Sequence, residues 1–469
     1  MWWIKGREIV QRMLLIWVLL FLPTRFISAQ SDPDGAAAPP EKAPVTWYCD
    51  PVNGSTPANA KDTGKGDGSK ENPWGTFESI IRLRLVNGAD PTKGQIHAGD
   101  TIKLMSGDHG KVSFQAPEYQ NTKSISVEAA EDESPTMTQV SVKFAKNWTF
   151  RGITFRCPES IGKGYMLFRG VEVSGFTVDK CRFQSIKDAT VWTDDDWTTK
   201  CAQYGLWLSG DDLTMTECSF YAIENCIYVE GTNILVDSNQ CEYFLNDGIE
   251  HCASNVKMTR NRITDQYNLA SNIFHHDGIQ GWSLKGVHQK NVVIDSNFVA
   301  RSTGKYKSIP AISSAVFQGI SIFDGPFSEV TISNNIVMAT ASHAISLYGC
   351  TDSTIERNTV IYQGMTPNKP CWIGVFVGKP KWGAIEPSNL QIRNNIAPTY
   401  ALTKMGVELE NNFALKAPNK PWSTSVTIVD PAKTFVKYDP AEAKFDLTVR
   451  KNGSTVGNVS RINGAGAKH

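Results

Sequence analysis

Two short segments of the sequence carry the side chains best suited to chemistry. Residues 246–251 read NDGIEH and residues 275–285 read HHDGIQGWSLK. Each segment contains an Asp-Gly turn, so Asp247 and Asp277 become neighbours if the segments stack in consecutive layers. Paired carboxylates in a polar setting either hold Ca²⁺ or separate their pKa values for acid–base chemistry. Asp247 and Asp277 are therefore candidate metal ligands, and the alternative is a turn Asp that bonds only its own backbone.

Basic side chains are concentrated in the same part of the chain. Four of the eight histidines lie between residues 251 and 288. Histidine, lysine and arginine can supply the base or the acid of a proton transfer. The candidate catalytic residues are His251, Arg262, His275, His276 and Lys285.

A short sequence motif recurs through the middle of the chain: a stretch of alternating apolar residues, then Asn or Cys, then another apolar pair. Successive Asn or Cys residues of this motif are 21 to 38 residues apart. The short intervals fit one minimal coil, and the long intervals fit a coil with an inserted loop. Asn tolerates a left-handed backbone and bonds its neighbours through its carboxamide. We therefore expect a stacked ladder at a tight bend, with Cys in the same small inward slot. The aligned residues are Cys181, Cys218, Asn239, Asn261, Asn297, Asn335, Asn358 and Asn395.

A second motif lies between successive copies of the first motif, and it shows the two-residue alternation of a β-strand. Short strands at recurring spacing, stacked in parallel, predict a β-solenoid. The residues expected to face the interior are Leu206, Ile227, Ile249, Ile279, Ile320, Ile345 and Val375. The residue after each should face outward. This outward column is Trp207, Tyr228, Glu250, Gln280, Ser321, Ser346 and Phe376.

The outward column combines aromatic rings with carboxylates and amides. A sugar chain offers apolar ring faces and hydroxyl edges, so such a surface suits glycan binding. The alternative is a solvent-facing strand with scattered aromatic residues. The candidate substrate-binding residues are Trp207, Tyr228, Glu250, Gln280 and Trp282.

The start of the chain carries a family resemblance. Residues 48–54 (YCDPVNG), 66–77 (GDGSKENPWGTF) and 98–104 (AGDTIKL) resemble the opening of the right-handed parallel β-helix proteins of the pectate-lyase-like superfamily. The resemblance implies an all-β fold, a single-stranded right-handed parallel β-helix over residues 46–465 with inserted loops. It also implies a short N-terminal capping helix over residues 76–83, with Thr76 as its N-cap.

The resemblance further implies a secreted polysaccharide lyase that cleaves an acidic, uronate-containing glycan by β-elimination. Such a reaction needs a neutralised C5 carboxylate, a base for the C5 proton and an acid for the 4-oxygen. The run from Asp277 to Lys285 is similar to a region of one calcium-dependent pectate-lyase group whose Lys is the base, so calcium is the expected cofactor if there is one. The alternatives are a glycoside hydrolase, a C5-epimerase, and a non-catalytic glycan-binding or adhesion protein.

The N-terminal residues predict export. Lys5, Arg7 and Arg12 precede or border a short apolar run at 13–22, so residues 1–29 are expected to be a signal peptide and residues 30–45 a flexible leader. Lys+Arg 47 balances Asp+Glu 47 in the whole chain, and removing residues 1–29 leaves 43 basic and 46 acidic residues, a net charge of −3.

These numbers set expectations for location and partners. The charge balance argues against a nucleic-acid binder. We expect an extracellular or periplasmic monomer that acts on an acidic polysaccharide and has no membrane attachment after signal cleavage. Export permits disulfides, but the apolar settings of several of the ten cysteines favour buried thiols for most, with room for one or two bridges.

Overall fold

The helices and strands that the structure describes all lie within Pro44–His469. The computed structural model describes residues 42–55, 66–88, 90, 94–116, 119–162, 164–271, 276–313, 316–364, 370–379, 381, 383–402 and 406–415, and the backbone of three later strands. The predicted signal peptide, the leader up to residue 41 and His275 lie outside the described residues. Among the helices that are described, none has the length and apolar character needed to span a bilayer.

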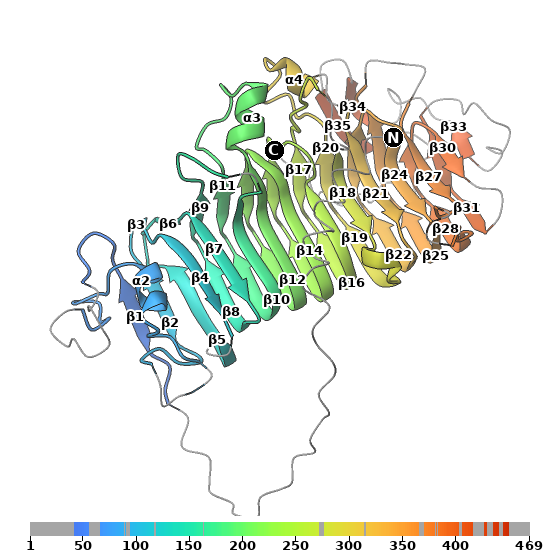
Figure 1. Cartoon of the computed structure of the whole chain (residues 1–469). Coiled ribbons are helices and arrows are strands. Elements are labelled where there is room, and N and C mark those ends of the chain that lie inside the picture. Colours follow the sequence, from blue (N-terminus) through green and yellow to red (C-terminus); the bar gives the residue numbers. More distant parts are fainter. Residues whose placement is uncertain are drawn as a thin grey trace, which may run out of the picture. The chain divides into compact units, whose positions relative to one another are not determined.

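Two long parallel sheets dominate the described part of the chain (Figure 1). The larger sheet has twenty strands: β1 (Thr46–Cys49), β2 (Thr101–Leu104), β4 (Lys111–Gln115), β5 (Gln120–Ala129), β7 (Gln139–Lys143), β8 (Lys146–Arg151), β10 (Met166–Asp179), β12 (Ala202–Thr216), β14 (Ile223–Asp237), β16 (Ile249–Thr259), β18 (Asp277–Trp282), β19 (Gln289–Asp295), β21 (Gln318–Asp324), β22 (Phe327–Ser333), β24 (His343–Tyr348), β25 (Cys350–Glu356), β27 (Trp372–Phe376), β28 (Ser388–Arg393), β30 (Tyr400–Leu402) and β31 (Val407–Glu410).

The second sheet has thirteen shorter strands, and a small antiparallel pair follows it in the chain. The thirteen strands are β3 (Gly107–Asp108), β6 (Pro135–Met137), β9 (Thr154–Arg156), β11 (Arg182–Gln184), β13 (Ser219–Tyr221), β15 (Gln240–Glu242), β17 (Arg262–Thr264), β20 (Phe298–Ala300), β23 (Ile336–Ala339), β26 (Thr359–Tyr362), β29 (Ile396–Ala397), β32 (Asn412–Ala414) and β33 (Val426–Ile428). The pair is β34 (Phe435–Asp439) with β35 (Lys444–Val449). The short helices are α2 (Phe77–Arg82), α3 (Asp194–Lys200), α4 (Pro310–Ser313) and the 3₁₀ turn η1 (Leu284–Gly286).

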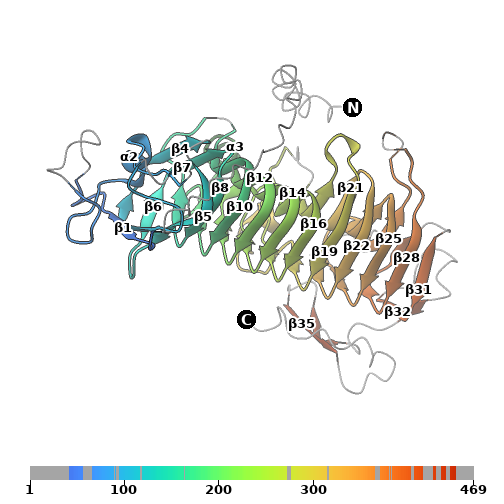
Figure 2. The same cartoon turned by 90° about the horizontal axis from the view of Figure 1, so that it is seen from below.

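Each coil of the solenoid stacks on the next in register, as Figure 2 shows for the ordered series of strands. Leu206 pairs with Ile227, Ile227 with Ile249, and Ile249 with Ile279, and all four side chains are fully buried. The predicted solenoid and this interior column are confirmed. The driving force is the burial of one apolar side chain per coil at each inward site, which removes it from water.

The long strands bend because glycine stands at the corner. Gly210 and Gly231 have φ values of 141° and 127°, which L side chains rarely adopt, and a Cβ at Gly231 would clash with the backbone of Gly210. The aligned residues in β10 and β16 are Val173 and Ala253, and the strands β10, β12, β14 and β16 all run through the corner unbroken. In later coils the same path is divided into pairs such as β18 and β19.

The predicted register is wrong at the seventh coil. Ile345 pairs with Ile373 rather than with Val375, and Ser346 pairs with Gly374 rather than with Phe376. Val375 pairs with Leu347 and Phe376 with Tyr348, so both face the predicted way but stand two residues along the strand from the predicted column. A bulge between His343 and Ile345 also places one extra residue in β24. A strict two-residue count along the sequence does not detect such a bulge.

The predicted asparagine ladder is confirmed and is one residue longer than expected. In Asn297, Oδ1 accepts from the backbone N of Asn261 at 2.9 Å, and Nδ2 donates to Oδ1 of Asn335 at 3.0 Å. The same pattern repeats between coils, ends at Asn412, and leaves each carboxamide buried. The ladder residues are Asn239, Asn261, Asn297, Asn335, Asn358, Asn395 and Asn412.

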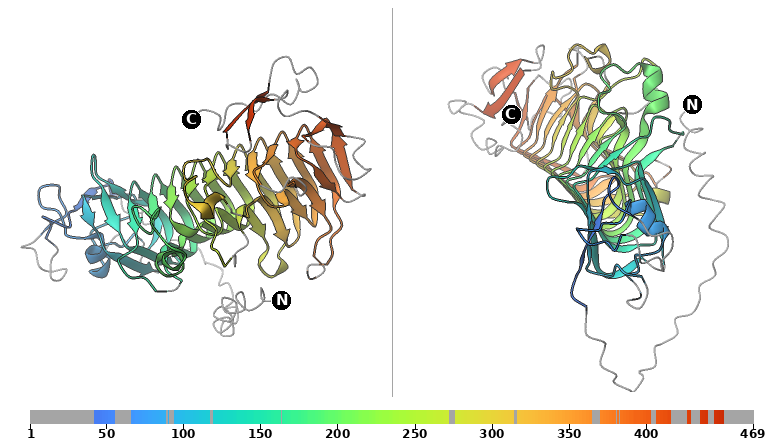
Figure 3. Two further views of the ribbon diagram at one scale, coloured as in Figure 1. Left: turned by 90° about the horizontal axis from the view of Figure 1, so that it is seen from above. Right: turned by 90° about the vertical axis from the view of Figure 1, so that its left-hand side faces the viewer.

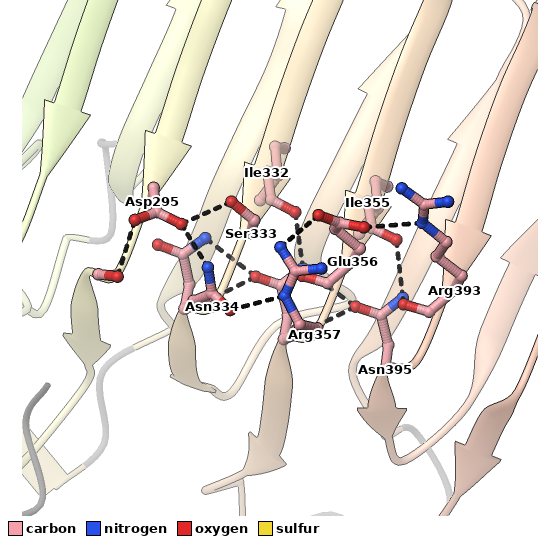
Figure 4. A network of polar contacts seen from close by, with 12 residues as sticks. Asp295, Ile332, Ser333, Asn334, Ile355, Glu356, Arg357, Arg393 and Asn395 are labelled. Carbon is pink, nitrogen blue, oxygen red and sulfur yellow. Dashed lines mark hydrogen bonds and ion pairs between the residues drawn. The ribbon is translucent and has the colours of Figure 1, made fainter. Parts of the chain in front are cut away.

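A polar network runs along the edge of the coils beside this ladder (Figure 4). Asp295 accepts from Ser333 and Asn334, each at 2.6 Å. Further along, Nε of Arg393 donates to Oε2 of Glu356 at 2.7 Å. Exposed ion pairs contribute at most about 1 kcal/mol each to stability. The network therefore stabilises the stacked coils less than the buried ladder and the apolar core do.

Cysteine occupies the ladder slot in the earlier coils. The backbone N of Cys218 donates to Oδ1 of Asn239 at 2.9 Å, and its thiol lies 3.5 Å from the carbonyl of Val178. All ten cysteines are free thiols, eight of them buried, so the expectation of buried thiols is confirmed and no bridge forms. Burial raises the pKa of the Cys218 thiol well above its usual range.

Replacing Cys218 by Asn should extend the ladder by one rung. A carboxamide at this slot would donate to the Val178 carbonyl, as Asn239 does to Met215 at 3.1 Å. We expect a gain of about 1 kcal/mol in the free energy of unfolding, the net value of one buried hydrogen bond. Urea unfolding of Cys218→Asn beside Cys218→Ser measures this, and equal midpoints for the two variants would contradict it.

The N-terminal helix closes one end of the core. In α2, Thr76 caps the helix by accepting from the backbone N of Ser79 at 3.1 Å, as predicted. Phe77 and Ile80 are fully buried, and the ring of Phe77 meets the ring of Phe150 edge-on at 6.5 Å. The helix thus covers apolar side chains that an open first coil would expose.

The inserted loops form a second, smaller apolar cluster outside the solenoid core. Trp197 of α3 stacks on Tyr267 at 4.8 Å, and Tyr243 lies 4.6 Å from Tyr306. Figure 3 shows α3 and α4 on one side of the coils. The loops lead directly into β12, β18 and β21, so their packing fixes where those three strands begin.

Candidate functional site

One outward column of the larger sheet gathers the residues that could bind a ligand. Trp207 pairs with Tyr228, Tyr228 with Glu250, and Glu250 with Gln280 on consecutive strands. The sequence predicted this column. The structure extends it by one coil, because Arg169 of β10 pairs with Trp207.

The aromatic members of this face stack on one another. The rings of Trp207 and Tyr228 are 5.1 Å apart and 7° from parallel, and Trp282 lies 6.0 Å from Tyr228. The guanidinium of Arg169 lies 5.4 Å from the centre of the Trp207 ring, a cation–π distance. Tyr228 is buried, whereas Trp207, Trp282 and Arg169 are half-buried. A flat aromatic surface with a cation at one end therefore remains accessible.

A carboxylate with a perturbed pKa stands beside the stacked rings. The hydroxyl of Tyr228 donates to Oε2 of Glu230 at 3.0 Å. Desolvation raises the pKa of Glu230, and the Tyr228 hydrogen bond and the charge of Lys285 only partly oppose this. Glu230 thus holds its proton to a higher pH than an ordinary glutamate, which is the property of a general acid.

Lys285 lies in a tight turn, near enough for its charge to lower the pKa of Glu230. It lies in η1 with φ 54°, a left-handed conformation that is costly for a lysine. The backbone N of the preceding Leu284 donates to the Sγ of Cys252 at 3.0 Å. Cys252 of β16 pairs with Glu230 of β14. The turn is thereby fixed over β16 and directs the exposed Lys285 towards Glu230.

A second carboxylate meets a phenol on the same face. The hydroxyl of Tyr204, at the start of the column beside Asn225, lies 3.4 Å from Oε1 of Glu250. Burial raises the pKa of Tyr204, and the neighbouring Glu250 and Asp247 raise it further. The tyrosine therefore stays protonated at neutral pH and can donate to Glu250 or to a ligand.

Asp247 and Asp277 are neighbours, as predicted, and each carboxylate accepts at least one hydrogen bond. Oδ1 of Asp247 accepts from the backbone N of Asp277 at 2.8 Å, and Oδ2 accepts from Asn246 at 3.1 Å. Nε2 of Gln280 donates to Oδ2 of Asp277 at 2.9 Å. Ca²⁺ takes six to eight oxygen ligands. No group of three or more His, Cys, Asp or Glu among the described residues is placed to hold a metal, and calcium binding by Asp247 and Asp277 stays a prediction.

Two of the predicted catalytic residues lie away from this face. His251 follows the outward Glu250 and therefore points inward, where it is fully buried beside Phe327 and close to Gly281. Arg262 belongs to β17 of the other sheet, and its guanidinium lies 4.5 Å from the ring of Phe298. Neither side chain can reach a ligand on the larger sheet.

His276 has a different role from the one predicted for a mobile base. It is buried, with Nδ1 3.0 Å from Nε2 of Gln266 and Nε2 3.1 Å from Oδ1 of Asn268. His276 thus fastens the loop before β18 next to Asp277.

Three functional side chains were absent from the predicted set: Arg169, Tyr204 and Glu230. Extending the alternation one coil towards the N-terminus would have found Arg169, because it occupies the column of Trp207. Glu230 is two residues beyond Tyr228 and faces the same way. The sequence contained the signal for both but not their contacts.

The buried histidine makes the fold sensitive to acid. Burial lowers the pKa of His251 to about 3, from 6.5 in an unfolded chain. The folded state therefore binds fewer protons, and stability is lost as pH falls through 6.5 towards 3. Between about pH 7.5 and pH 4.5 the loss attributable to His251 is about 3 kcal/mol.

His251→Leu should remove that part of the acid sensitivity. Urea unfolding at the two pH values measures it for the wild type, for His251→Leu and for the exposed control His288→Leu. The control should keep the wild-type pH dependence. A variant His251→Leu that loses as much stability as the wild type on acidification would contradict the prediction.

Comparison with known proteins identifies the architecture. Residues 204–414 match the model of a family described as right handed beta helix region. No curated protein matches the sequence. Among solved structures, the pectate lyase Pel9A is 12% identical, with 88% of this chain and 90% of that chain covered and a TM-score of 0.39.

Two further solved structures have other activities. A lacto-N-biosidase from Eubacterium ramulus is 9% identical, with 82% of this chain and 68% of that chain covered and a TM-score of 0.43. The A-module of a mannuronan C-5 epimerase from Azotobacter vinelandii is 10% identical, with 70% and 91% covered and a TM-score of 0.35. At such identities the activity has to be argued from the residues themselves.

Proposed function

We propose, from the premise that this chain is a right-handed parallel β-helix protein, that it is an enzyme acting on an acidic polysaccharide. The observation that supports this is the convergence of Glu230, Lys285 and the stacked Trp207 and Tyr228 on one outward face. The C–H faces of sugar rings pack well against flat aromatic rings, whose faces carry partial negative charge. Substrate would lie along the column of strands.

The reaction we favour is β-elimination at a uronate. Lys285 would take the C5 proton, and Glu230 would give its proton to the departing 4-oxygen as the C4–O bond breaks and the C4–C5 double bond forms. Arg169 and the Gln280 amide would bind substrate carboxylates. Each of these steps is assigned to side chains of this chain alone.

Glycoside hydrolysis is the second candidate, and the spacing of Glu230 and Glu250 favours it. The two residues lie on adjacent strands with a two-residue offset, so their Cα atoms are about 8 Å apart. Inverting glycosidases hold the carboxyl groups of the acid and the base about 6.5–9.5 Å apart, a separation that side chains on Cα atoms at this spacing can adopt. Glu230 would again protonate the leaving oxygen, and Glu250 would activate water.

One assay separates these reactions. Residues 30–469, purified, are incubated with polygalacturonate, alginate and neutral glucans, while ultraviolet absorbance and reducing ends are followed together. Elimination gives an unsaturated uronate that absorbs, and hydrolysis gives reducing ends without absorbance. C5 inversion without cleavage, visible by proton NMR, would indicate an epimerase. Binding without any product would favour a non-catalytic protein, and no interaction with any glycan would refute the proposal.

A further inference from the structure

A second aromatic cluster occupies the same face of the larger sheet, in the next three coils. It is formed by Phe323, His343, Tyr348, Trp372 and Phe376, from β21, β24 and β27. The ring centres of His343 and Trp372 are 4.6 Å apart, those of Tyr348 and Phe376 4.7 Å, and those of Trp372 and Phe376 5.0 Å. Phe323 is buried, whereas the other four rings are half-buried. They therefore present aromatic surface to solvent.

Small residues lie in register between these rings. Ser321 pairs with Ser346, and Ser346 pairs with Gly374. A side chain at Gly374 would clash with the rings of Trp372 and Phe376, so glycine is what lets the rings approach the sheet. The hydroxyls of Ser321 and Ser346 are fully buried and have no hydrogen-bond partner in the described part of the chain. Buried polar groups are normally satisfied, so two adjacent exceptions indicate a missing polar partner.

Positive charge borders the cluster. Nζ of Lys379 lies 2.5 Å from Oδ1 of Asp324, and Nζ of Lys381 lies 3.7 Å from Oδ2 of the same carboxylate. Lys379 also lies 5.8 Å from the ring of Phe323. Asp324 is buried, so it holds both ammonium groups at the edge of the aromatic surface. Two cations converge there on one anion.

We propose that this cluster is a second binding site for an acidic polysaccharide, in which sugar rings stack on Trp372 and Phe376 and Lys379 and Lys381 bind carboxylates. The inference rests on the proposed function for the identity of the glycan. Trp282 pairs with Asp324, so the two aromatic surfaces adjoin. Six strand-to-strand steps separate Trp207 from Gly374, about 29 Å along the solenoid.

The continuity of the two surfaces has a consequence for affinity. A polymer long enough to span them engages both at once, and the second contact is then intramolecular. Affinity should therefore depend on the length of the glycan. The lysine contribution should weaken with added salt, whereas stacking should persist.

Affinity electrophoresis in gels containing polygalacturonate or alginate tests this without requiring cleavage. All proteins carry Glu230→Gln, which keeps the polymer intact. Trp372→Ala should weaken retardation about tenfold, and Lys379→Met should weaken it severalfold and reduce its salt dependence. Phe144→Ala, an exposed aromatic residue outside the cluster, and Lys180→Met, an exposed lysine, are the matched controls. Lys379 is a surface side chain, so its variant tests the site even if Trp372→Ala fails to fold.

The outcomes separate this site from the proposed activity. Retardation that drops for the cluster variants supports the second site, whether or not the wild type releases product. Equal retardation of cluster variants and controls refutes the site, even if the wild type cleaves the polymer. Retardation of the parent Glu230→Gln protein that is equally strong in a neutral glucan refutes the assignment to an acidic ligand.

Discussion

Replacing Asn297 by Ala should lower the free energy of unfolding by about 3–5 kcal/mol, among the largest effects of any single substitution in this fold. The carboxamide accepts from both the backbone N and Nδ2 of Asn261, at 2.9 and 3.0 Å, and donates to the carbonyl of Met258 at 2.9 Å. Alanine would leave those groups buried without partners. Each such group costs about 1–3 kcal/mol.

The expected loss depends on burial and not on the residue type. Asn72 is exposed, and Asn72→Ala should change stability by less than about 0.5 kcal/mol. Equilibrium urea unfolding, followed by tryptophan fluorescence and by far-ultraviolet circular dichroism, compares the two variants. A loss below about 1 kcal/mol for Asn297→Ala would show that the ladder follows from coil stacking and does not stabilise it.

The sequence predicts the ladder and the inward column because both are periodic. A stacked coil repeats the same environment at each bend and at each inward site, so the same residue types return at matching places. The register of Trp207, Tyr228, Glu250 and Gln280 follows from this periodicity. At β27 the predicted alignment was two residues off, although Val375 faces inward and Phe376 outward as predicted.

The catalytic candidates were chosen by residue type, and type does not determine direction. Strand alternation already required His251 to point inward once Glu250 points outward. Arg262 follows the ladder residue Asn261, after which the chain enters β17 of the second sheet. The periodic pattern therefore already excluded His251 and Arg262 from the outward face of the larger sheet.

Loop residues could not be placed in this way. His276 and Lys285 lie at the ends of inserted segments, whose course depends on tertiary packing and not on a repeat. His276 is held by Gln266 and Asn268, and Lys285 is directed by a turn attached to Cys252. Only the folded structure shows that His276 is held within its loop and that the turn places Lys285 near Glu230.

Replacing Glu230 by Gln should reduce kcat about a hundredfold or more, the usual contribution of a general acid. The substitution keeps the shape and the contact with Tyr228 but removes the proton that the leaving oxygen needs. The exposed Glu217→Gln is the matched control and should keep wild-type turnover. Wild-type turnover by Glu230→Gln would remove Glu230 from the mechanism.

The pH profile tests the same role of Glu230 independently of how far kcat falls. Desolvation raises the pKa of Glu230, so the activity that depends on its protonated form should fall only as pH rises through a value above about 4.3, the ordinary pKa of glutamate. That alkaline limb should be absent from the residual activity of Glu230→Gln. Lys285→Met and Glu250→Gln then identify the base, because loss of turnover with the first indicates elimination and loss with the second indicates hydrolysis.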